Sequence, residues 1–163
     1  MQMKSLLVIG AGGHGHVVAE TAQACGYQIS FLDDHSPDAI GTIAQLEELA
    51  PKFDACFVAI GNNAFRKQLM EQLQSHSCTL ATLVHPTAFV APSVKIGQGT
   101  IVAPKALINT RSMIGIGCIL SAGSIIDHDV VIQDYVHINA GAICKAGTTV
   151  LEGQKIDAGQ VVC

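Results

Sequence analysis

The sequence has 163 residues and a formal net charge of −4, with 49% apolar and only 13% charged residues. It contains no Lys/Arg run, which argues against nucleic acid as a partner, and no apolar run of the roughly 18 residues that span a membrane. So many apolar residues with so little charge predict a large core and outer faces buried against copies of the same chain.

The amino-terminal residues lead directly into the apolar stretch Leu6-Leu7-Val8-Ile9, which is too short for the hydrophobic region of a signal peptide. The six cysteines show no CxxC spacing. In a chain without an export signal we expect them to be reduced core thiols, and we expect the protein to be cytoplasmic.

The first eighty residues alternate between short apolar runs and helical patterns. The runs at 6–9, 29–32 and 55–60 predict strands, and 79–84 predicts a fourth that leads into the second half of the chain. The segments 17–24, 46–49 and 65–74 predict helices. This order predicts a Rossmann-like α/β domain over residues 1–82, a small parallel sheet with helices on both faces.

Gly10, Gly12 and Gly15 form a GxGxxG pattern between the first strand and the first helix. Such glycines let a phosphate approach the backbone at a helix N-terminus, and Asp33 follows at the distance expected for a ribose contact. NAD is one interpretation, but the segment is only half a dinucleotide fold, so a mononucleotide-sized ligand fits better. Alternatively, the glycines only pack the helix on the strand.

The carboxyl ends of parallel strands face one crevice, so the segments 12–14, 33–34 and 61–63 should converge. Backbone amides and His14 would meet phosphates there, while Asp33 and Asp34 would meet a cation and hydroxyls. Together they are complementary to a phosphorylated sugar that carries an ammonium group. Arg66 could reach a phosphate from the following helix, but we interpret it as a solvated charge on the helix face.

From residue 83 to residue 163 the sequence repeats every six residues. A hexapeptide period predicts a parallel β-helix, in which short strands stack coil upon coil around a column of aliphatic side chains. The large apolar slots are Val84, Val90, Ile96, Val102, Ile108, Ile114, Leu120, Ile126, Ile132, Ile138, Cys144, Val150, Ile156 and Val162, and small or β-branched residues follow most of them four places later.

His128 departs from this pattern, because it lies between Asp127 and Asp129. A carboxylate beside an imidazole orients the ring and raises its basicity, as a general base requires. The alternative is a surface histidine paired with an aspartate. His137 lies nine residues on, half a coil if a coil is three hexads, so the two histidines would be on different faces and would meet only across a subunit boundary. A structural role for His137 is an equal alternative.

A zinc site shared between subunits of a trimer is a further interpretation of these histidines. Only His128 and His137 lie well inside the repeat, since His85 is at its beginning, so we expect no metal.

Four motifs occur in one order: Gly-Gly-His-Gly-His in the first loop, Phe-Leu-Asp-Asp after the second strand, Ala-Ile-Gly-Asn-Asn-x-x-Arg after the third, and Ile-Ile-Asp-His-Asp-Val-Val-Ile in the repeat. With a glycine-rich βαβ domain joined to hexapeptide repeats, the chain resembles bacterial sugar O-acyltransferases of the sialic-acid type. It resembles more closely the UDP-4-amino-sugar N-acetyltransferases of bacillosamine-type glycan pathways.

The resemblance implies a left-handed β-helix and a homotrimer with acetyl-CoA between adjacent helices. It places the catalytic histidine at His128 and the neighbour that raises its basicity, usually a glutamate, at Asp129. The implied acetyl-CoA contacts are His137, Ala146 and Ala158. The implied nucleotide-sugar contacts are Gly12, Gly13, His14, Asp33, Asp34 and Gly61. Members of this family usually continue for several more hexads, whereas this sequence ends at Cys163 within a repeat.

We therefore expect acetyl transfer from acetyl-CoA to the amine of a UDP-linked 4-amino sugar, with His128 as general base and no covalent acyl-enzyme. Asp33 and Asp34 suit a cationic amino sugar and favour transfer to nitrogen. The alternatives are transfer to a sugar hydroxyl, a nucleotide-sugar-binding module without acyl transfer, and a metal-dependent trimer.

Overall fold

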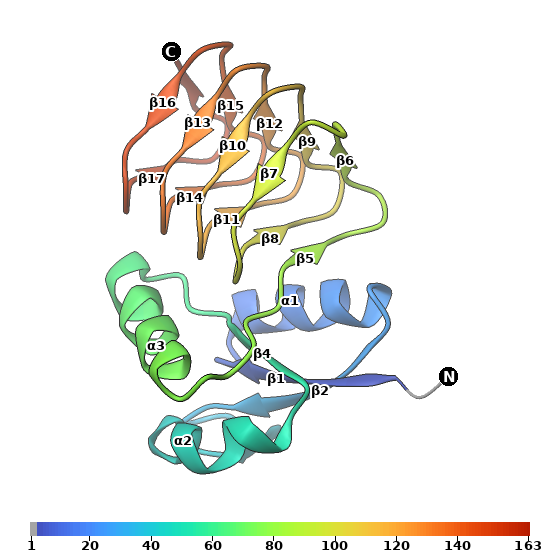
Figure 1. Cartoon of the computed structure of the whole chain (residues 1–163), viewed down its shortest axis with the longest axis vertical. Helices are drawn as coiled ribbons and strands as arrows, with labels where there is room; N and C mark the ends of the chain where they lie inside the picture. The colour runs from blue at the N-terminus through green and yellow to red at the C-terminus, as the bar shows by residue number, and fades with distance from the viewer. Residues whose placement is uncertain (1–2) are drawn as a thin grey trace. The chain divides into compact units, whose positions relative to one another are not determined.

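The computed structural model describes residues 3–163 and divides into two compact units, one ending at Ala81 and the other running from Thr82 to Cys163. No helix within the described residues has the length and apolar character that crossing a bilayer requires. Figure 1 shows helices and longer strands in the first unit and only short strands in the second.

The first unit is a four-stranded parallel sheet in the order β3-β2-β1-β4. Figure 1 shows α1 and α2 on opposite sides of this sheet. Its elements are β1 (Lys4–Ile9), α1 (Gly13–Ala24), β2 (Tyr27–Leu32), β3 (Ala39–Gly41), α2 (Leu46–Leu49) flanked by 3-10 turns at Ile43–Gln45 and Ala50–Lys52, β4 (Ala55–Val58) and α3 (Asn63–Ser75).

The predicted strands and helices of this unit are confirmed, apart from the fourth strand predicted at 79–84. Residues 79–84 do not form a fourth strand of the sheet: Leu80 makes a single bridge to Cys56, and Leu83 begins the repeat. The sheet therefore ends at β4 on that side, and its opposite edge is β3, a strand that the sequence pattern did not predict. Three residues, one of them Gly41, are too short to show the alternation that identifies a strand.

The glycines after β1 fall into two kinds: two are required by close packing, and two have free space around them. Gly10 has a φ of +101°, and a side chain on Gly15 would collide with the carbonyl of Gly10. These two glycines let α1 begin directly against the end of β1, so the interpretation as a packing motif is confirmed for them. A Cβ on Gly12 or Gly13 would meet no atom within 4 Å, so the backbone there remains approachable.

The second unit is a parallel β-helix with coils of 18 residues, so that each strand pairs with the third one along the chain, as Ile101 does with Ile119. It has three stacks: the β11 stack (β17-β14-β11-β8-β5), the β12 stack (β18-β15-β12-β9-β6) and the β10 stack (β16-β13-β10-β7). The strands are β5 (Leu83–Val84), β6 (Phe89–Val90), β7 (Lys95–Ile96), β8 (Ile101–Val102), β9 (Leu107–Ile108), β10 (Met113–Ile114), β11 (Ile119–Leu120), β12 (Ile125–Ile126), β13 (Val131–Ile132), β14 (His137–Ile138), β15 (Ile143–Cys144), β16 (Thr149–Val150), β17 (Lys155–Ile156) and β18 (Val161–Val162).

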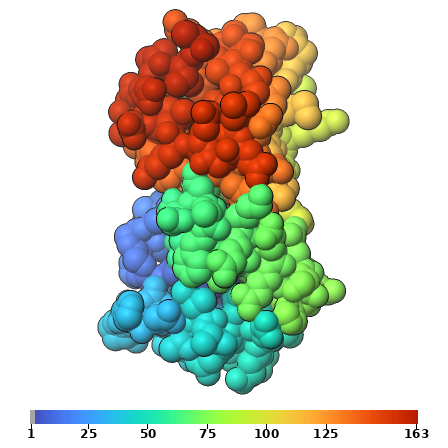
Figure 2. All heavy atoms as spheres, turned by 90° about the vertical axis from the view of Figure 1, so that its left-hand side faces the viewer, coloured from blue at the N-terminus to red at the C-terminus, as the bar shows by residue number. Residues whose placement is uncertain are grey.

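The core of this unit is the predicted column. The second residue of each strand is the large apolar slot of its hexad, and the small residues four places later fill the corners of the same cluster. In the middle coils these side chains are essentially inaccessible, as Ile126 and Val130 are. In the space-filling view of Figure 2, the atoms of successive coils lie in contact on the face that is shown.

Each hexad from residue 99 onward turns its corner with one residue in the left-handed region of backbone space. That conformation costs most residues about 1–2 kcal/mol but is open to glycine, which occupies most of these positions. Lys105, Arg111, Asp129 and Tyr135 occupy the remaining ones, at φ values between 57° and 60°. At these corners a side chain has replaced the conformationally preferred glycine.

Candidate functional site

His128 lies in the corner between β12 and β13, and Asp127 shapes that corner. The Oδ1 atom of Asp127 accepts the backbone N–H of His128 at 2.8 Å and the side-chain N–H of Asn109, one coil earlier, at 3.3 Å. A side-chain acceptor on a neighbouring backbone N–H is a common way to hold a turn. Of the two aspartates beside His128, Asp127 therefore organises the backbone.

Asp129 is the carboxylate that holds the imidazole. The Nδ1 atom of His128 lies 2.6 Å from Oδ2 of Asp129, and both side chains remain 40% or more exposed. Asp129 has a left-handed backbone conformation, and its side chain reaches the ring although it is shorter than that of glutamate. With Nδ1 engaged, Nε2 is the nitrogen that can take a proton from a reacting group, which is the geometry of a general base.

Arg111 adds a third member that the sequence analysis did not identify. Its Nε and Nη2 atoms donate to Oδ1 and Oδ2 of Asp129, each at 2.6 Å. These two bonds, followed by the one from His128, hold the pKa of the Asp129 carboxyl well below its usual range. The sequence spacing could have revealed this contact, because Arg111 precedes Asp129 by 18 residues, the length of one coil.

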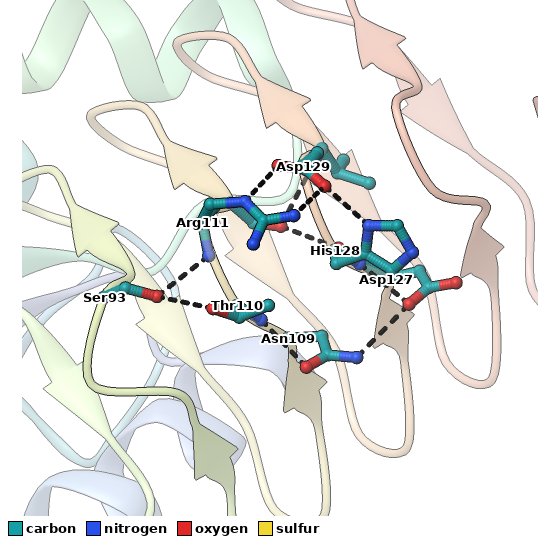
Figure 3. A network of polar contacts seen from close by, with 9 residues as sticks. Ser93, Asn109, Thr110, Arg111, Asp127, His128 and Asp129 are labelled. Atoms are coloured by element: carbon teal, nitrogen blue, oxygen red, sulfur yellow. Dashed lines mark hydrogen bonds and ion pairs between the residues drawn. The ribbon is translucent and has the colours of Figure 1, made fainter.

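The coil before this corner continues the network (Figure 3). The Oγ atom of Ser93 accepts the backbone N–H of Arg111 at 2.9 Å and lies 2.9 Å from the hydroxyl of Thr110. The Thr110 N–H in turn donates to the side-chain oxygen of Asn109 at 2.8 Å. Polar side chains from three successive coils therefore support one exposed imidazole and its carboxylate.

His137 lies in β14, a strand of the β11 stack, and not at the corner of His128. It is 9% exposed, and its Nε2 atom is 3.3 Å from the hydroxyl of Ser121. The coil of 18 residues and this placement confirm the prediction that the two histidines belong to different faces of one helix. The structure does not bring them together within the chain.

Of the two alanines implied as acetyl-CoA contacts, Ala146 lies beside the His128 corner and Ala158 does not. Ala146 occupies the turn stacked on that of His128, because Ile126 pairs with Cys144 and the N–H of Gly147 donates to the carbonyl of His128. Ala158 lies in the exposed turn between β17 and β18.

In the first unit, Asp33 ties the loop after β2 to the glycine loop after β1. Its Oδ2 atom accepts the N–H of Ala11 at 2.8 Å, and its Oδ1 atom accepts the N–H groups of His35 and Ser36, each at 2.9 Å. These bonds, with that from Ala11 the largest, hold the pKa of the Asp33 carboxyl below its usual value. Of the three segments predicted to converge, the loops after β1 and β2 are thus brought together, with Asp33 as the link.

Asp34 and Gly61 are more open. The Asp34 side chain is exposed and accepts the N–H of Ile43 at 2.9 Å. Gly61 follows β4 and precedes Asn62, whose side chain caps α3 by accepting the N–H of Phe65 at 2.9 Å. A Cβ on Gly61 would meet no atom within 4 Å, as at Gly12 and Gly13.

Arg66 is fully buried, so its interpretation as a solvated helix-face charge is wrong. Its guanidinium donates to the carbonyl of Ile60 at 2.8 Å and to Oδ1 of Asn63 at 2.7 Å. These bonds replace water around the charge and allow the burial. Burial, and next the charge of Arg66, lowers the pKa of His14 to about 4, so this histidine is neutral at neutral pH.

No group of three or more His, Cys, Asp or Glu side chains within residues 3–163 is arranged to hold a metal ion. A hollow of about 290 Å³ on the β10 stack is lined by Met113, Gly115, Asp134 and Glu152, among others. It contains none of the predicted site residues.

Comparison with known proteins gives matches to both halves of the chain. Residues 5–73 match the family described as PglD N-terminal domain. The chain is 36% identical over 112 residues to UDP-N-acetylbacillosamine N-acetyltransferase of Bacillus subtilis (strain 168), an alignment that covers 61% of this chain and 51% of the relative. The chain thus spans about half the length of that curated relative.

Two solved structures resemble nearly the whole chain. The acetyltransferase domain of PglB from Neisseria gonorrhoeae FA1090, in complex with acetyl coenzyme A, matches 98% of this chain and 82% of its own at 39% identity, with a TM-score of 0.94. A histidine variant of perosamine N-acetyltransferase from Caulobacter crescentus, in complex with CoA and GDP-perosamine, matches 99% and 90% at 28% identity, with a TM-score of 0.88.

Proposed function

Because the chain belongs to the family of bacterial hexapeptide-repeat acyltransferases that contains the UDP-4-amino-sugar N-acetyltransferases, we propose that it transfers the acetyl group of acetyl-CoA to the amine of a nucleotide-linked amino sugar. The relatives are named for N-acetylation, which favours transfer to nitrogen over transfer to a hydroxyl. We further propose a UDP-linked 4-amino sugar as the acceptor.

The contact between His128 and Asp129 is the observation that carries this proposal. Its 2.6 Å bond leaves Nε2 of an exposed imidazole available at a corner that also contains Ala146. As the amine attacks the thioester carbonyl, Nε2 takes the proton from nitrogen, the tetrahedral oxyanion collapses and the CoA thiolate leaves. A backbone N–H near the bound thioester would stabilise the oxyanion.

This route uses no covalent acyl-enzyme, because a thioester is already an activated acyl donor. Cys144, two residues before Ala146, is no candidate nucleophile: its side chain is buried in the column, and burial raises the pKa of its thiol to about 11. A thiol of that pKa carries almost no thiolate at neutral pH.

We assign nucleotide-sugar binding to the loops of the first unit. Gly12, Gly13 and Gly61 offer open backbone, and neutral His14 can donate or accept a hydrogen bond near the fixed charge of Arg66. This combination suits phosphate, since backbone amides at the start of α1 and a buried cation both favour an anion. Asp33 and Asp34 are our proposed contacts for hydroxyls and the ammonium group.

We also propose that the coil is left-handed and that the protein is a homotrimer with acetyl-CoA between neighbouring β-helices. The outward residues of the β12 stack support assembly, since they form an unbroken apolar column: Phe89, Leu107, Ile125, Ile143 and Val161. In such a trimer, His137 and Ala158 of one chain would contact the acetyl-CoA that is bound at the His128 corner of a neighbouring chain.

The test is thiol release from acetyl-CoA in the presence of UDP- and GDP-linked 4-amino sugars, with the matching 4-hydroxy sugars as controls. We expect thiol release with a UDP-linked amine, and an acetylated product that resists mild base, as an amide does. A base-labile product would indicate transfer to oxygen. Nucleotide-sugar binding without thiol release from any acceptor would contradict acyl transfer.

A further inference from the structure

We propose that Arg111 is a positioning residue for acyl transfer, which fixes the Asp129 carboxylate so that this carboxylate holds the His128 ring in its reactive orientation. The inference rests on the proposed function and adds a residue to it. Arg111 acts on the imidazole only through Asp129, and no contact of Arg111 with a substrate is required.

The geometry of the pair favours positioning over a loose surface ion pair. A carboxylate held at one oxygen can still rotate, whereas Asp129 is bound at both oxygens by a planar guanidinium, with both distances at 2.6 Å. Two parallel bonds fix the plane of the carboxylate. Because Oδ2 also contacts Nδ1 of His128 at 2.6 Å, the plane of the carboxylate determines where the ring can lie.

The backbone provides an independent argument. Arg111 and Asp129 both occupy left-handed corner positions that most hexads fill with glycine, at φ values of 59°. They stack in register 18 residues apart, and the Oγ atom of Ser93 accepts the N–H of Arg111 from the coil before. Lys105 shares the conformation and the charge of Arg111, but no ion pair is found for it within residues 3–163. The conformation alone therefore does not explain the pairing at the His128 corner.

The charges at this corner predict what removal of the guanidinium does. The ionisable groups at the corner are Asp127 and Asp129 in the same turn, Arg111 from the coil before, and Lys145, which holds the Asp127 position in the coil after. Without Arg111, the negative charge of Asp129 is no longer shared with a guanidinium. It then stabilises the protonated imidazole more strongly, so a higher pH is needed to free the base.

The experiment compares Arg111→Gln with Lys105→Gln, which removes the same charge from an equivalent corner. For Arg111→Gln we expect kcat to fall about 10-fold, as when residues that orient a reactive group are lost, with KM for the sugar unchanged. We also expect the acidic limb of the kcat profile to move to higher pH. Lys105→Gln should change neither. Unaltered kcat and pH profile in Arg111→Gln, or equal effects of the two variants, would overturn the proposal.

Two further variants separate positioning from folding. Arg111→Gly removes the side chain at a backbone conformation that glycine prefers, so the thermal unfolding temperature should not fall while kcat does. Arg111→Lys keeps the positive charge but loses the two parallel N–H donors of the guanidinium. Its pH profile should therefore lie closer to that of the unaltered protein than its kcat does. A loss of stability in Arg111→Gly that parallels its loss of kcat would indicate a structural role only.

A titration of the histidine rings by NMR tests the inference without turnover. The His128 signal is assigned by its absence in His128→Asn, and in Arg111→Gln it should titrate at higher pH than in the unaltered protein. An unchanged titration overturns the inference even if the enzyme is active. A raised titration in a protein that acetylates no sugar supports the Arg111–Asp129–His128 coupling and contradicts only the proposed function.

Discussion

His14 illustrates how one neighbour sets the behaviour of a residue at the glycine loop. Burial and the charge of Arg66 both oppose protonation, so its pKa of about 4 lies below the 6.5 of an unfolded chain. Between these two values the unfolded state binds the proton that the folded state does not. Stability should therefore be fully present above pH 6.5 and be lost as the pH falls toward 4.

The prediction is that this one histidine contributes up to about 3 kcal/mol of acid-dependent destabilisation across that window. His14→Gln should flatten the pH dependence of the free energy of unfolding between pH 6.5 and 4. His16→Gln removes the exposed histidine of the same helix and should leave the slope unchanged. The measurement is urea unfolding at a series of pH values, and equal slopes for all three proteins would count against the argument.

His128 could be identified from the sequence because it lies between two carboxylates, whereas most other hexads carry small, uncharged residues at the same positions. The residue pattern alone does not distinguish Asp127 from Asp129, since both are adjacent to the ring; the resemblance to the family assigned Asp129, and the folded backbone brings this aspartate to Nδ1. Arg111 and Arg66 were missed or misread for a related reason. A charge on an exposed face and a charge that reaches a distant acceptor look alike until the chain is folded.

At the scale of the element, the strands of the repeat are only two residues long, and the two residues of each strand face opposite sides of the coil wall. The second residue enters the column and the first points outward, as Ile126 and Ile125 do in β12. The six-residue period reveals this division in the sequence, which is why the coils could be predicted hexad by hexad. The three-residue β3 has no period, and for that reason it could not be predicted.

The pair in β12 offers a matched test of the column. Ile126→Ala should lower the free energy of unfolding by about 2–5 kcal/mol, because a fully buried side chain leaves a cavity in a packed core. Ile125→Ala, in the same strand at 38% exposure, should cost clearly less in the isolated chain. Chemical unfolding at low protein concentration measures both, and equal costs would argue against the inward column.

At the scale of the whole molecule, the question is what covers the outward apolar column of the β12 stack. Phe89, Ile125 and Val161 are 56%, 38% and 51% exposed in the single chain, and all lie on this one stack. Contiguous apolar surface of this kind is typical of an interface between subunits. The low charged fraction of the sequence already indicated such a surface, although not which stack carries it.

Sedimentation equilibrium should therefore give the mass of three chains at micromolar concentration. Ile125→Glu, at the middle of the column, should shift the protein toward the mass of one chain, because the interface would then bury an unpaired charge. Thr149→Glu, an exposed outward position on the β10 stack, is the control and should not. A protein that sediments as a single chain without substitution would contradict the trimer and the acetyl-CoA site that depends on it.

The central claim is that the His128 imidazole takes the proton from the acceptor amine, and steady-state turnover of His128→Gln tests it most directly. We predict that kcat falls by about 100- to 10,000-fold, while the calorimetric Kd for the nucleotide sugar stays within about twofold. His85→Gln, which alters a histidine at the start of the repeat, is the control and should keep full kcat. A His128→Gln protein that turns over at the unaltered rate would contradict the account.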